Sequence, residues 1–351
     1  MDISKIDSNF KIDSKISKPD IRFYNANQPP FTLYGVYYDN GKYCRMPESV
    51  AKNTNEGVLS LYDNTAGGRV AFKTDSDYIA IYAKMHKVNK SSHMPITCSA
   101  GFDLYERVNK KHKFINAFMP PFDIETGYES VIELSSGGLR EYIINFPTYS
   151  GVIDLYIGLN KNAAVKAADS YDGDKPIVYY GSSITQGGCA SRPGNSYEAL
   201  ISSWLNRDYI NLGFSGNAKG EDAIAEYISR LDMSFFVYDY DYNAPDADYL
   251  RATHERMFGI IRKANPDLPI LIVSMPKHRL SENGIKRLNV IKSTYENAVK
   301  NGDKNVYFLA GNEMFDDVAD DTGTVDGVHP GDYGFYVMAK KIGAIIENIN
   351  N

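Results

Sequence analysis

IVYYGSSIT, residues 177–185, is a short apolar run followed by a turn that carries two serines. An uninterrupted apolar run of this length is typical of a strand buried on both faces of a parallel sheet. A serine on the turn that leaves such a strand can act as a nucleophile if a base lies within hydrogen-bond reach. In DGVHP, residues 326–330, a histidine follows an aspartate by three positions, a spacing that suits a base and the group that orients it. Together the two segments suggest an ester-hydrolysing site.

The second half of the chain continues the pattern of a strand followed by a helix. Further strand-like runs occur at residues 209–212, 235–240, 270–274 and 306–310, and helical patterns separate them. In one of these patterns Leu250, His254, Met257 and Ile261 recur at the spacing of one helix face, and a last helix is expected over residues 334–347. Strict alternation of strand and helix predicts a parallel sheet with helices on both faces.

The first half of the chain contains short β-rich runs separated by turns. The expected strands are residues 33–38, 57–62, 70–73, 78–82, 96–99, 128–134 and 142–146. Short strands at this spacing predict an antiparallel β-sandwich of the jelly-roll type, and no helix is expected before residue 160. The small, polar and charged segment 160–175 marks a domain boundary. The expected division is an accessory domain over residues 1–165 and an α/β domain over residues 172–351.

The composition excludes several classes of partner. Of the 351 residues 43% are hydrophobic and 23% are charged, with a net charge of −6, so no electrostatic argument favours nucleic acid or an anionic membrane. Neither the N-terminal residues nor any other stretch resembles a signal peptide or a membrane helix, and a cytoplasmic location is therefore expected. The three cysteines show no CxxC spacing and no HExxH motif occurs, which argues against a disulfide scaffold and against a zinc site.

Six histidines are candidates for the base, and three of them lie in the strand-rich half. His254 lies on the apolar face of its helix, which favours a packed residue. His278 follows a strand and can line the site. Only His329 has an acidic residue three positions before it. Asp326 can therefore hold the Nδ1–H of His329 and leave Nε2 for Ser183.

Ester hydrolysis also needs hydrogen-bond donors for an oxyanion. The backbone N–H groups of Ser183 and Gly216 and the side-chain amide of Asn243 are candidates, because each residue follows an expected strand at the carboxyl edge of the sheet. Taken singly, Gly216 is also explained as a turn glycine, and Asn243 as a loop cap before Ala244-Pro245.

Four blocks occur in a fixed order in the second half: GSSIT, NLGFSGN, DYN and DGVHP. In this order they resemble the SGNH, or GDSL-type, hydrolase superfamily, whose blocks supply Ser, Gly, Asn and His on a flavodoxin-like sheet. The resemblance implies a three-layer α/β/α domain with Ser183 as the nucleophile and with Asp326 and His329 as its partners. It places Gly216 and Asn243 in the oxyanion hole. In the first half, GFDLY at residues 101–105 resembles the GxDLY signature of the β-rich domain that precedes the hydrolase domain in one bacterial branch.

Two departures from the superfamily pattern affect the site. Ser182 stands where the superfamily usually has an aspartate, and the third block lacks its usual glycine. The second departure leaves Asn217, on a neighbouring loop, as an alternative donor. Cys189 has no acid–histidine pair that can be assigned to it over Ser183 and is expected to be a bystander. Arg192 can bind substrate, although an arginine in an Arg-Pro-Gly loop more often ties that loop to nearby carbonyls or acids.

Several members of related two-domain branches are carbohydrate esterases. The resemblance therefore implies a serine esterase that removes O-acetyl groups from plant-derived oligosaccharides, such as acetylated manno- or xylo-oligosaccharides, and needs no metal or organic cofactor. The alternatives are a lipid or thioester hydrolase on the same site and a glycan-binding protein with an inactive hydrolase domain. No long apolar lid is apparent, which disfavours lipids, and the intact triad disfavours an inactive domain. The oligomeric state is left open, with a homodimer among the options.

Overall fold

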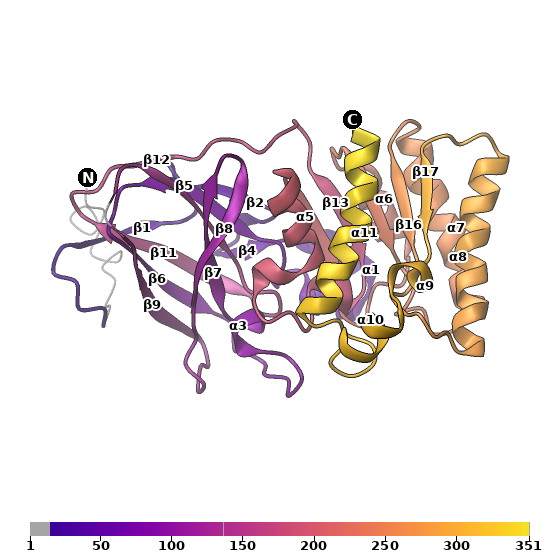
Figure 1. The fold of residues 1–351 in the computed structure, drawn as a ribbon, viewed down its shortest axis with the longest axis horizontal. Helices are drawn as coiled ribbons and strands as arrows, with labels where there is room; N and C mark the ends of the chain where they lie inside the picture. Colours follow the sequence, from indigo (N-terminus) through magenta and orange to yellow (C-terminus); the bar gives the residue numbers. More distant parts are fainter. Residues whose placement is uncertain (1–14, 136, 351) are drawn as a thin grey trace.

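The computed structural model describes residues 15–135 and 137–350. An antiparallel β-rich domain lies beside an α/β domain, with the N-terminal end of the described chain far from the C-terminal helix (Figure 1). Residues 1–7, on which the expectation of no signal peptide depends, lie outside the described residues. Within the described ranges no helix has the length and apolarity needed to cross a membrane.

A five-stranded parallel sheet forms the centre of the second domain. Its strands are β13 (Ile177–Gly181), β14 (Tyr209–Gly213), β15 (Phe235–Asp239), β16 (Ile270–Val273) and β17 (Val306–Leu309), and they agree with the predicted runs. Their order across the sheet is β14-β13-β15-β16-β17, which is the flavodoxin-like order. Every residue of β13 is buried, as its unbroken apolar run predicts. The strand order switches at β13, because β14 lies on one side of it and the later strands β15 to β17 lie on the other. Such folds place their ligands at this switch point, between β13 and β15.

Helices cover both faces of this sheet (Figure 1). On one face lie α5 (Tyr197–Leu205) and α11 (Asp332–Asn350), and on the other lie α6 (Asp222–Ser229), α7 (Ala247–Ala264) and α8 (Glu282–Lys300). His254 of α7 is fully buried and its ring stacks on Tyr238 with centroids 4.4 Å apart. Burial lowers the pKa of His254 to about 3, so it is a neutral packing residue, in agreement with its place in the helical pattern.

The first domain is a sandwich of two antiparallel sheets. One has the order β1-β11-β6-β9, and the other has the order β12-β5-β10-β7-β8 with β2 also paired to β5. Their bounds are β1 (Ile21–Asn25), β2 (Thr32–Tyr34), β5 (Arg69–Thr74), β6 (Tyr78–Met85), β7 (Phe102–Val108), β8 (Lys111–Phe118), β9 (Gly127–Glu133), β10 (Arg140–Asn145), β11 (Val152–Asn160) and β12 (Val165–Ala167). The apolar residues between the two sheets form one core. A hairpin of β3 (Tyr37–Asp39) and β4 (Lys42–Cys44) lies outside both sheets.

Three short helices in the first half show that two strand predictions were wrong, and that the expectation of no helix before residue 160 was wrong as well. Residues 57–62 belong to α2 (Glu56–Leu61), residues 96–99 form α3 (Ile96–Ser99), and α1 (Glu48–Thr54) precedes both. The side chain of Asn55 caps α2 by accepting a hydrogen bond from the N–H of Val58, at 2.8 Å. Val58 then packs into the core of the α/β domain, not into the sandwich. Segments of four to six residues are too short to show a helical period, which explains the error.

Two buried arginines of the first domain join it to β14. The guanidinium of Arg45 donates to the carbonyl of Gly213 at 2.7 Å, and that of Arg69 donates to the carbonyl of Tyr209 at 3.0 Å and pairs with Asp208. Burial lowers the pKa of Arg45 to about 10, and the carbonyl oxygens of Leu61, Asn211 and Gly213 accept hydrogen bonds from its guanidinium. The sandwich is therefore fixed beside the central sheet through buried charged contacts, which need matched partners on both sides.

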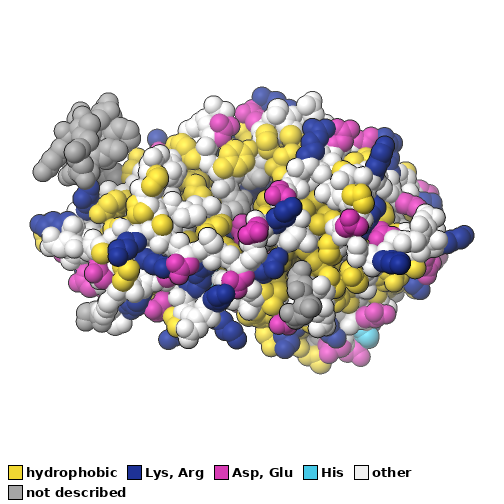
Figure 2. All heavy atoms as spheres, turned by 90° about the horizontal axis from the view of Figure 1, so that it is seen from above, with side chains coloured by type: hydrophobic (Ala, Val, Ile, Leu, Met, Phe, Trp, Pro, Cys, Tyr) yellow, Lys and Arg dark blue, Asp and Glu magenta, His cyan; other side chains and the backbone are white. Residues whose placement is uncertain are grey.

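The face shown in Figure 2 carries charges of both signs. On the face shown in Figure 2, Lys and Arg side chains alternate with Asp and Glu side chains over both domains. This mixture is consistent with the small net charge of −6.

Candidate active site

Ser183 begins α4 (Ser183–Gln186), a single helical turn that directly follows β13. Ser182 has an extended backbone, and its Oγ accepts a hydrogen bond from the N–H of Ile184 at 3.2 Å, which caps the turn. Gly187, at φ +97°, ends it. The carboxyl edge of the central strand thus presents Ser183 on a fixed turn, with 8% of its surface exposed. The N–H groups of a first helical turn have no backbone acceptor within the helix, so that of Ser183 can face a substrate, whereas that of Ile184 is bonded to Ser182.

A chain of hydrogen bonds joins Ser183, His329 and Asp326. The Oγ of Ser183 lies 2.9 Å from Nε2 of His329, and Nδ1 of His329 lies 2.8 Å from Oδ2 of Asp326. These are the contacts of a nucleophile, a base and the carboxylate that orients the base. The structure therefore brings together the three residues to which the sequence assigns the triad.

The loop that carries the histidine also holds Asp326 ionised. Oδ1 of Asp326 accepts hydrogen bonds from the N–H groups of Val328 at 3.0 Å and His329 at 2.8 Å. Partial burial acts to raise the pKa of Asp326, but these hydrogen bonds and the bond to the His329 ring outweigh it and hold the pKa at about 2. Asp326 therefore stays ionised down to a pH of about 2.

The oxyanion candidates lie on the loops after β14 and β15. Gly216 has φ +70°, a left-handed conformation that favours glycine. Oδ1 of Asn243 accepts the N–H of Ala218 at 3.2 Å, so the loops of Gly216 and Asn243 are joined and the Nδ2 of Asn243 is directed away from that bond. Asn217, the alternative donor, instead gives Nδ2 to the carbonyl of Ser215 at 2.7 Å, and its side chain packs against the backbone of Gly57. Of the two asparagines, this geometry favours Asn243 as the candidate donor to an oxyanion.

Side-chain hydrogen bonds connect the β domain to the turn that carries Ser183. The hydroxyl of Tyr149 donates to the carbonyl of Ser183 at 3.1 Å. The side-chain amide of Gln186 donates to the carbonyl of Thr148 at 3.1 Å and accepts the N–H of Ser215 at 2.9 Å. One glutamine therefore links the sandwich, the nucleophile helix and the loop that contains Gly216.

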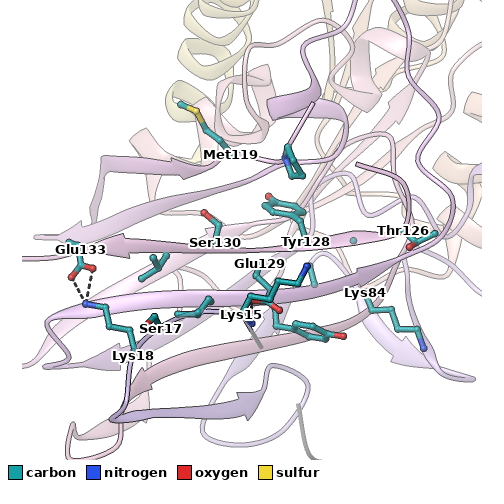
Figure 3. A pocket seen from close by; sticks show the side chains of 16 residues that line it. Lys15, Ser17, Lys18, Lys84, Met119, Thr126, Tyr128, Glu129, Ser130 and Glu133 are labelled. Atoms are coloured by element: carbon teal, nitrogen blue, oxygen red, sulfur yellow. Dashed lines mark hydrogen bonds and ion pairs between the residues drawn. The ribbon is translucent and has the colours of Figure 1, made fainter. Parts of the chain in front are cut away.

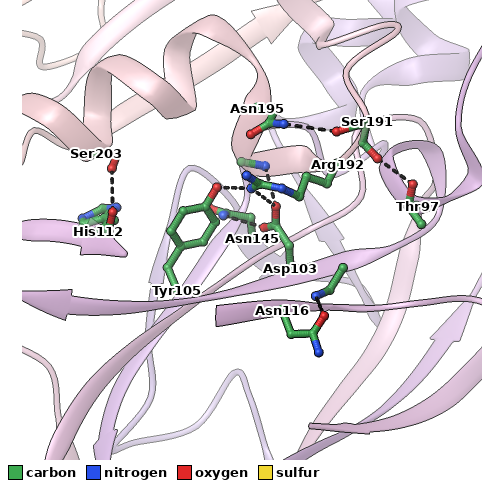
Figure 4. Close-up of polar contacts among 12 residues, drawn as sticks. Thr97, Asp103, Tyr105, His112, Asn116, Asn145, Ser191, Arg192, Asn195 and Ser203 are labelled. Atoms are coloured by element: carbon green, nitrogen blue, oxygen red, sulfur yellow. Dashed lines mark hydrogen bonds and ion pairs between the residues drawn. The ribbon is translucent and has the colours of Figure 1, made fainter. Parts of the chain in front are cut away.

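The GxDLY segment holds the loop that follows the nucleophile turn (Figure 4). Asp103 is fully buried and accepts hydrogen bonds from Asn145 at 2.7 Å, from the N–H of Gly194 at 2.9 Å and from Arg192 at 3.2 Å. The guanidinium of Arg192 also bonds the hydroxyl of Tyr105 and lies 3.8 Å from the ring centroid of Phe114. These are the contacts expected of an arginine that ties its loop to a nearby acid. Its second assignment, as a substrate-lining residue, stays a prediction.

Replacing Asp103 with alanine is expected to lower the free energy of unfolding by about 2–4 kcal/mol, because it leaves Arg192 and the N–H of Gly194 without their buried acceptor. Urea denaturation followed by circular dichroism measures this change. Glu133→Gln is the matched control, because its ion pair with Lys18 is exposed and should not alter the unfolding midpoint. Equal midpoints for Asp103→Ala and the control would show that the motif does not stabilise the domain contact.

His278 lies on the loop after β16, as predicted, and contacts the segment that precedes the triad loop. Its backbone N–H bonds Asp320 at 2.7 Å, and Nδ1 lies 3.0 Å from the carbonyl of Phe315. Over the described residues, no hydrogen bond connects it to a member of the triad. Its assignment as a lining residue is therefore still a prediction.

Two residues that the sequence did not assign to the site lie beside His329. The ring centroid of His93, from a turn of the β domain, is 5.6 Å from that of His329, and Cys189 is their neighbour. Burial, with a smaller contribution from Asp326, raises the pKa of Cys189 to about 11, which makes the thiol a poor nucleophile at neutral pH. No local pattern identifies His93, because only the packing of the two domains brings it to the site.

A separate groove of about 1170 Å³ lies on the sandwich (Figure 3). Residues of β6 and β9 and the segment 15–18 line it, and the ion pair of Lys18 and Glu133, at 2.8 Å, lies at one end of the lining residues (Figure 3). None of the triad residues lines this groove. It is therefore distinct from the hydrogen-bonded site at the sheet edge.

Comparison with known proteins gives matches for both domains. Residues 174–347 match the GDSL-like lipase/acylhydrolase family, and residues 21–165 match the N-terminus of SGNH-hydrolase-type esterases. A Bacteroides ovatus protein named as a GDSL-like lipase is 28% identical with a TM-score of 0.85, over 94% of this chain and 98% of that one.

Two further solved structures share the fold. The salicylyl-acyltransferase SsfX3 of a tetracycline biosynthetic pathway is 18% identical with a TM-score of 0.76, over 95% of this chain and 98% of that one. A family two carbohydrate esterase from Clostridium thermocellum, in complex with cellohexaose, is 16% identical with a TM-score of 0.61, over 91% and 98%. Among curated proteins, none matches the chain.

Proposed function

Because residues 174–347 belong to the GDSL-like lipase/acylhydrolase family and follow an SGNH-esterase-type N-terminal domain, we propose that this chain is a serine esterase that removes O-acetyl groups from oligosaccharides. The hydrogen-bonded chain of Ser183, His329 and Asp326 is the observation that carries the proposal. A hydroxyl placed 2.9 Å from an imidazole nitrogen that a carboxylate orients can be deprotonated as it attacks a carbonyl.

In the first half of the reaction, Oγ of Ser183 attacks the acetyl carbonyl while Nε2 of His329 takes the hydroxyl proton. The oxyanion of the tetrahedral intermediate accepts hydrogen bonds from the N–H groups of Ser183 and Gly216 and from Nδ2 of Asn243. His329 then gives its proton to the departing sugar oxygen, which leaves an acetyl group on Ser183.

In the second half, His329 removes a proton from a water molecule that attacks the acetyl-serine. The intermediate collapses, the proton returns to Oγ of Ser183, and acetate is released. Asp326 remains a carboxylate in both halves and stabilises the imidazolium each time it forms. Apart from the substrate and this water molecule, the proposed chemistry uses only groups of this chain.

The sugar substrate has weaker support than the ester chemistry. The Clostridium thermocellum carbohydrate esterase shares the two-domain fold along 91% of this chain. The β domain also lies close enough to the triad to contact a bulky alcohol, since its His93 is next to His329. We propose acetylated manno- or xylo-oligosaccharides as substrates. Lipid esters are the second candidate, because the Bacteroides ovatus protein is named as a lipase.

Replacing Asn243 with alanine is expected to lower kcat for acetyl ester cleavage by about a hundredfold, because it removes one donor to the oxyanion. Asn217→Ala is the matched control on the neighbouring loop, and it should retain kcat within a few fold because its amide is already bonded to Ser215. The kcat values of both variants with a chromogenic acetate ester test the assignment. The reverse ranking would assign the donor to Asn217.

The substrate class is tested with a panel of defined acetylated manno- and xylo-oligosaccharides, chromogenic esters of increasing acyl length and acyl-coenzyme A. Released acid is quantified, and NMR reads which acetyl groups remain on each sugar. The proposal expects kcat/KM to be highest for one class of acetylated sugar and to fall with acyl length. A maximum for long acyl chains would favour the lipid candidate, and oligosaccharide binding without turnover would favour an inactive binding protein.

A further inference from the structure

His93, Cys189 and His329 form a cluster of potential metal ligands beside the nucleophile. One donor atom from each residue lies within 4.8 Å of the other two. His93 comes from a turn of the β domain, Cys189 from the loop after the nucleophile helix, and His329 from the triad loop. Since the three residues are far apart in the chain, no short motif could have signalled the cluster.

The three side chains differ in how free their donor atoms are to bind a cation. Asp326 holds Nδ1–H of His329, so the lone pair that remains is that of Nε2, which accepts the hydroxyl of Ser183. His93 is exposed, and within the described residues no hydrogen bond engages its ring. The thiol of Cys189 is free and buried.

The backbone conformation of Cys189 is also unusual. Cys189 has φ +145°, a region that residues with a side chain rarely adopt. The two preceding residues are glycines, either of which would adopt such a backbone more easily. Unusual backbone conformations of this kind cluster at ligand-binding and catalytic sites. Here the conformation belongs to the residue whose sulfur lies beside two imidazoles.

We propose that His93, Cys189 and His329 bind Zn²⁺ or a similarly thiophilic divalent cation, and that the bound ion holds the esterase inactive. Two imidazoles and a thiolate are a common zinc donor set, and water can complete the tetrahedron. In a zinc site the ligand atoms lie about 3.5 Å apart, so the donors must converge by roughly 1 Å. A rotation of the exposed His93 side chain can supply much of this movement.

Binding displaces one proton and blocks the base. The sulfur of Cys189 gives its proton to solvent and donates an electron pair to the cation, with no change in oxidation state. The lone pair of His329 Nε2 is then bonded to the cation and no longer accepts the proton of Ser183. The inhibition rests on the proposed esterase function, whereas the binding does not.

Binding is tested on the full chain with Co²⁺ as a spectroscopic probe for Zn²⁺. Wild type and Ser183→Ala are both expected to show thiolate-to-cobalt charge-transfer absorption that Zn²⁺ abolishes. Cys189→Ala should lose the band, and His93→Ala should weaken binding by at least about tenfold, because it removes a ligand. Cys44→Ala and His86→Ala are the matched controls and should bind as wild type. No band in wild type, or a band that survives in Cys189→Ala, would overturn the site.

Inhibition is tested by titrating Zn²⁺ into the esterase assay and restoring activity with a chelator. Without metal, Cys189→Ala should keep a rate close to that of wild type, and the inhibition of each variant is measured against its own metal-free rate. His93→Ala and Cys189→Ala should both need at least about ten times more Zn²⁺ for half inhibition, while Mg²⁺ inhibits none of them. Cobalt binding without inhibition would overturn the inhibitory role. A chain with no esterase activity would refute the proposed function, and the spectrum of Ser183→Ala would still decide the metal site.

Discussion

Replacing Ser183 with alanine is expected to lower kcat/KM for an acetate ester by at least about ten-thousandfold, because the covalent route needs the hydroxyl that lies 2.9 Å from His329. The variant should fold normally, since the Oγ of Ser183 bonds only the catalytic imidazole among the described contacts. Hydrolysis of a chromogenic acetate, followed with circular dichroism as a folding check, measures the loss. Mass spectrometry of wild type quenched during turnover should show one acetyl group on Ser183.

Ser182→Ala is the matched control at the adjacent position. It removes the cap of α4 and should cost about 1 kcal/mol of stability, yet it leaves the nucleophile in place. Its activity should stay within about tenfold of wild type, since a single capping bond has a modest effect on the turn. A folded Ser183→Ala protein with undiminished turnover would mean that another group, such as Cys189, attacks the ester.

Replacing Asp326 with asparagine is expected to lower kcat by about a hundred- to ten-thousandfold with little change in KM, because an amide holds the wrong imidazole tautomer and does not stabilise the imidazolium. Because the pKa of Asp326 is about 2, its contribution to the free energy of unfolding also depends on pH. A carboxyl whose pKa falls on folding contributes stability above its unfolded pKa near 4, and this contribution is lost as the pH falls towards 2. Asp326→Asn should therefore lose some stability at neutral pH and approach wild type near pH 2.

The matched control for this variant is Asp317→Asn. Asp317 is an exposed acid in the preceding helix α10 (Asp317–Thr322), and its side chain is 72% exposed. Its removal changes the net charge equally but should leave kcat unaltered. If Asp326→Asn retains the kcat of wild type, Asp326 does not orient His329, and the hydrogen bond between their side chains has no catalytic role.

The sequence predicted the fold of the α/β domain well, and it singled out Ser183, His329 and Asp326, because the signals for both are local. Helices such as α7 and α8 are long enough to show a 3.6-residue period, and the strands between them are unbroken apolar runs. Asp326 and His329 lie in one turn, so their spacing alone indicates that they can pair. The serine block follows the most continuous of these runs, which places Ser183 at the sheet edge.

The features that the sequence missed are very short helices, strands interrupted by charged residues, and contacts that depend on long-range packing. The helices α2 and α3 contain six and four residues, and strands β7 and β8 carry charged residues at their turn, which hides their alternation. The contact of His93 with His329 and the bond between Asp103 and Arg192 both cross the domain boundary. No window of sequence contains both partners, so only the assembled fold reveals them.

The buried guanidinium groups of Arg45 and Arg69 have a consequence for the history of the molecule. Each guanidinium donates to a carbonyl oxygen of the second domain. A different second domain would need acceptors at the same positions. Exchanging the second half alone would leave these buried charges with only the acceptors of their own half, the carbonyls of Leu61 and Gly67, and exchanging the first half alone would leave Asp208 without its cation. Either change is expected to cost several kcal/mol, on the order of a large share of a domain's stability. The two halves are therefore expected to be inherited together, and to unfold as one cooperative unit.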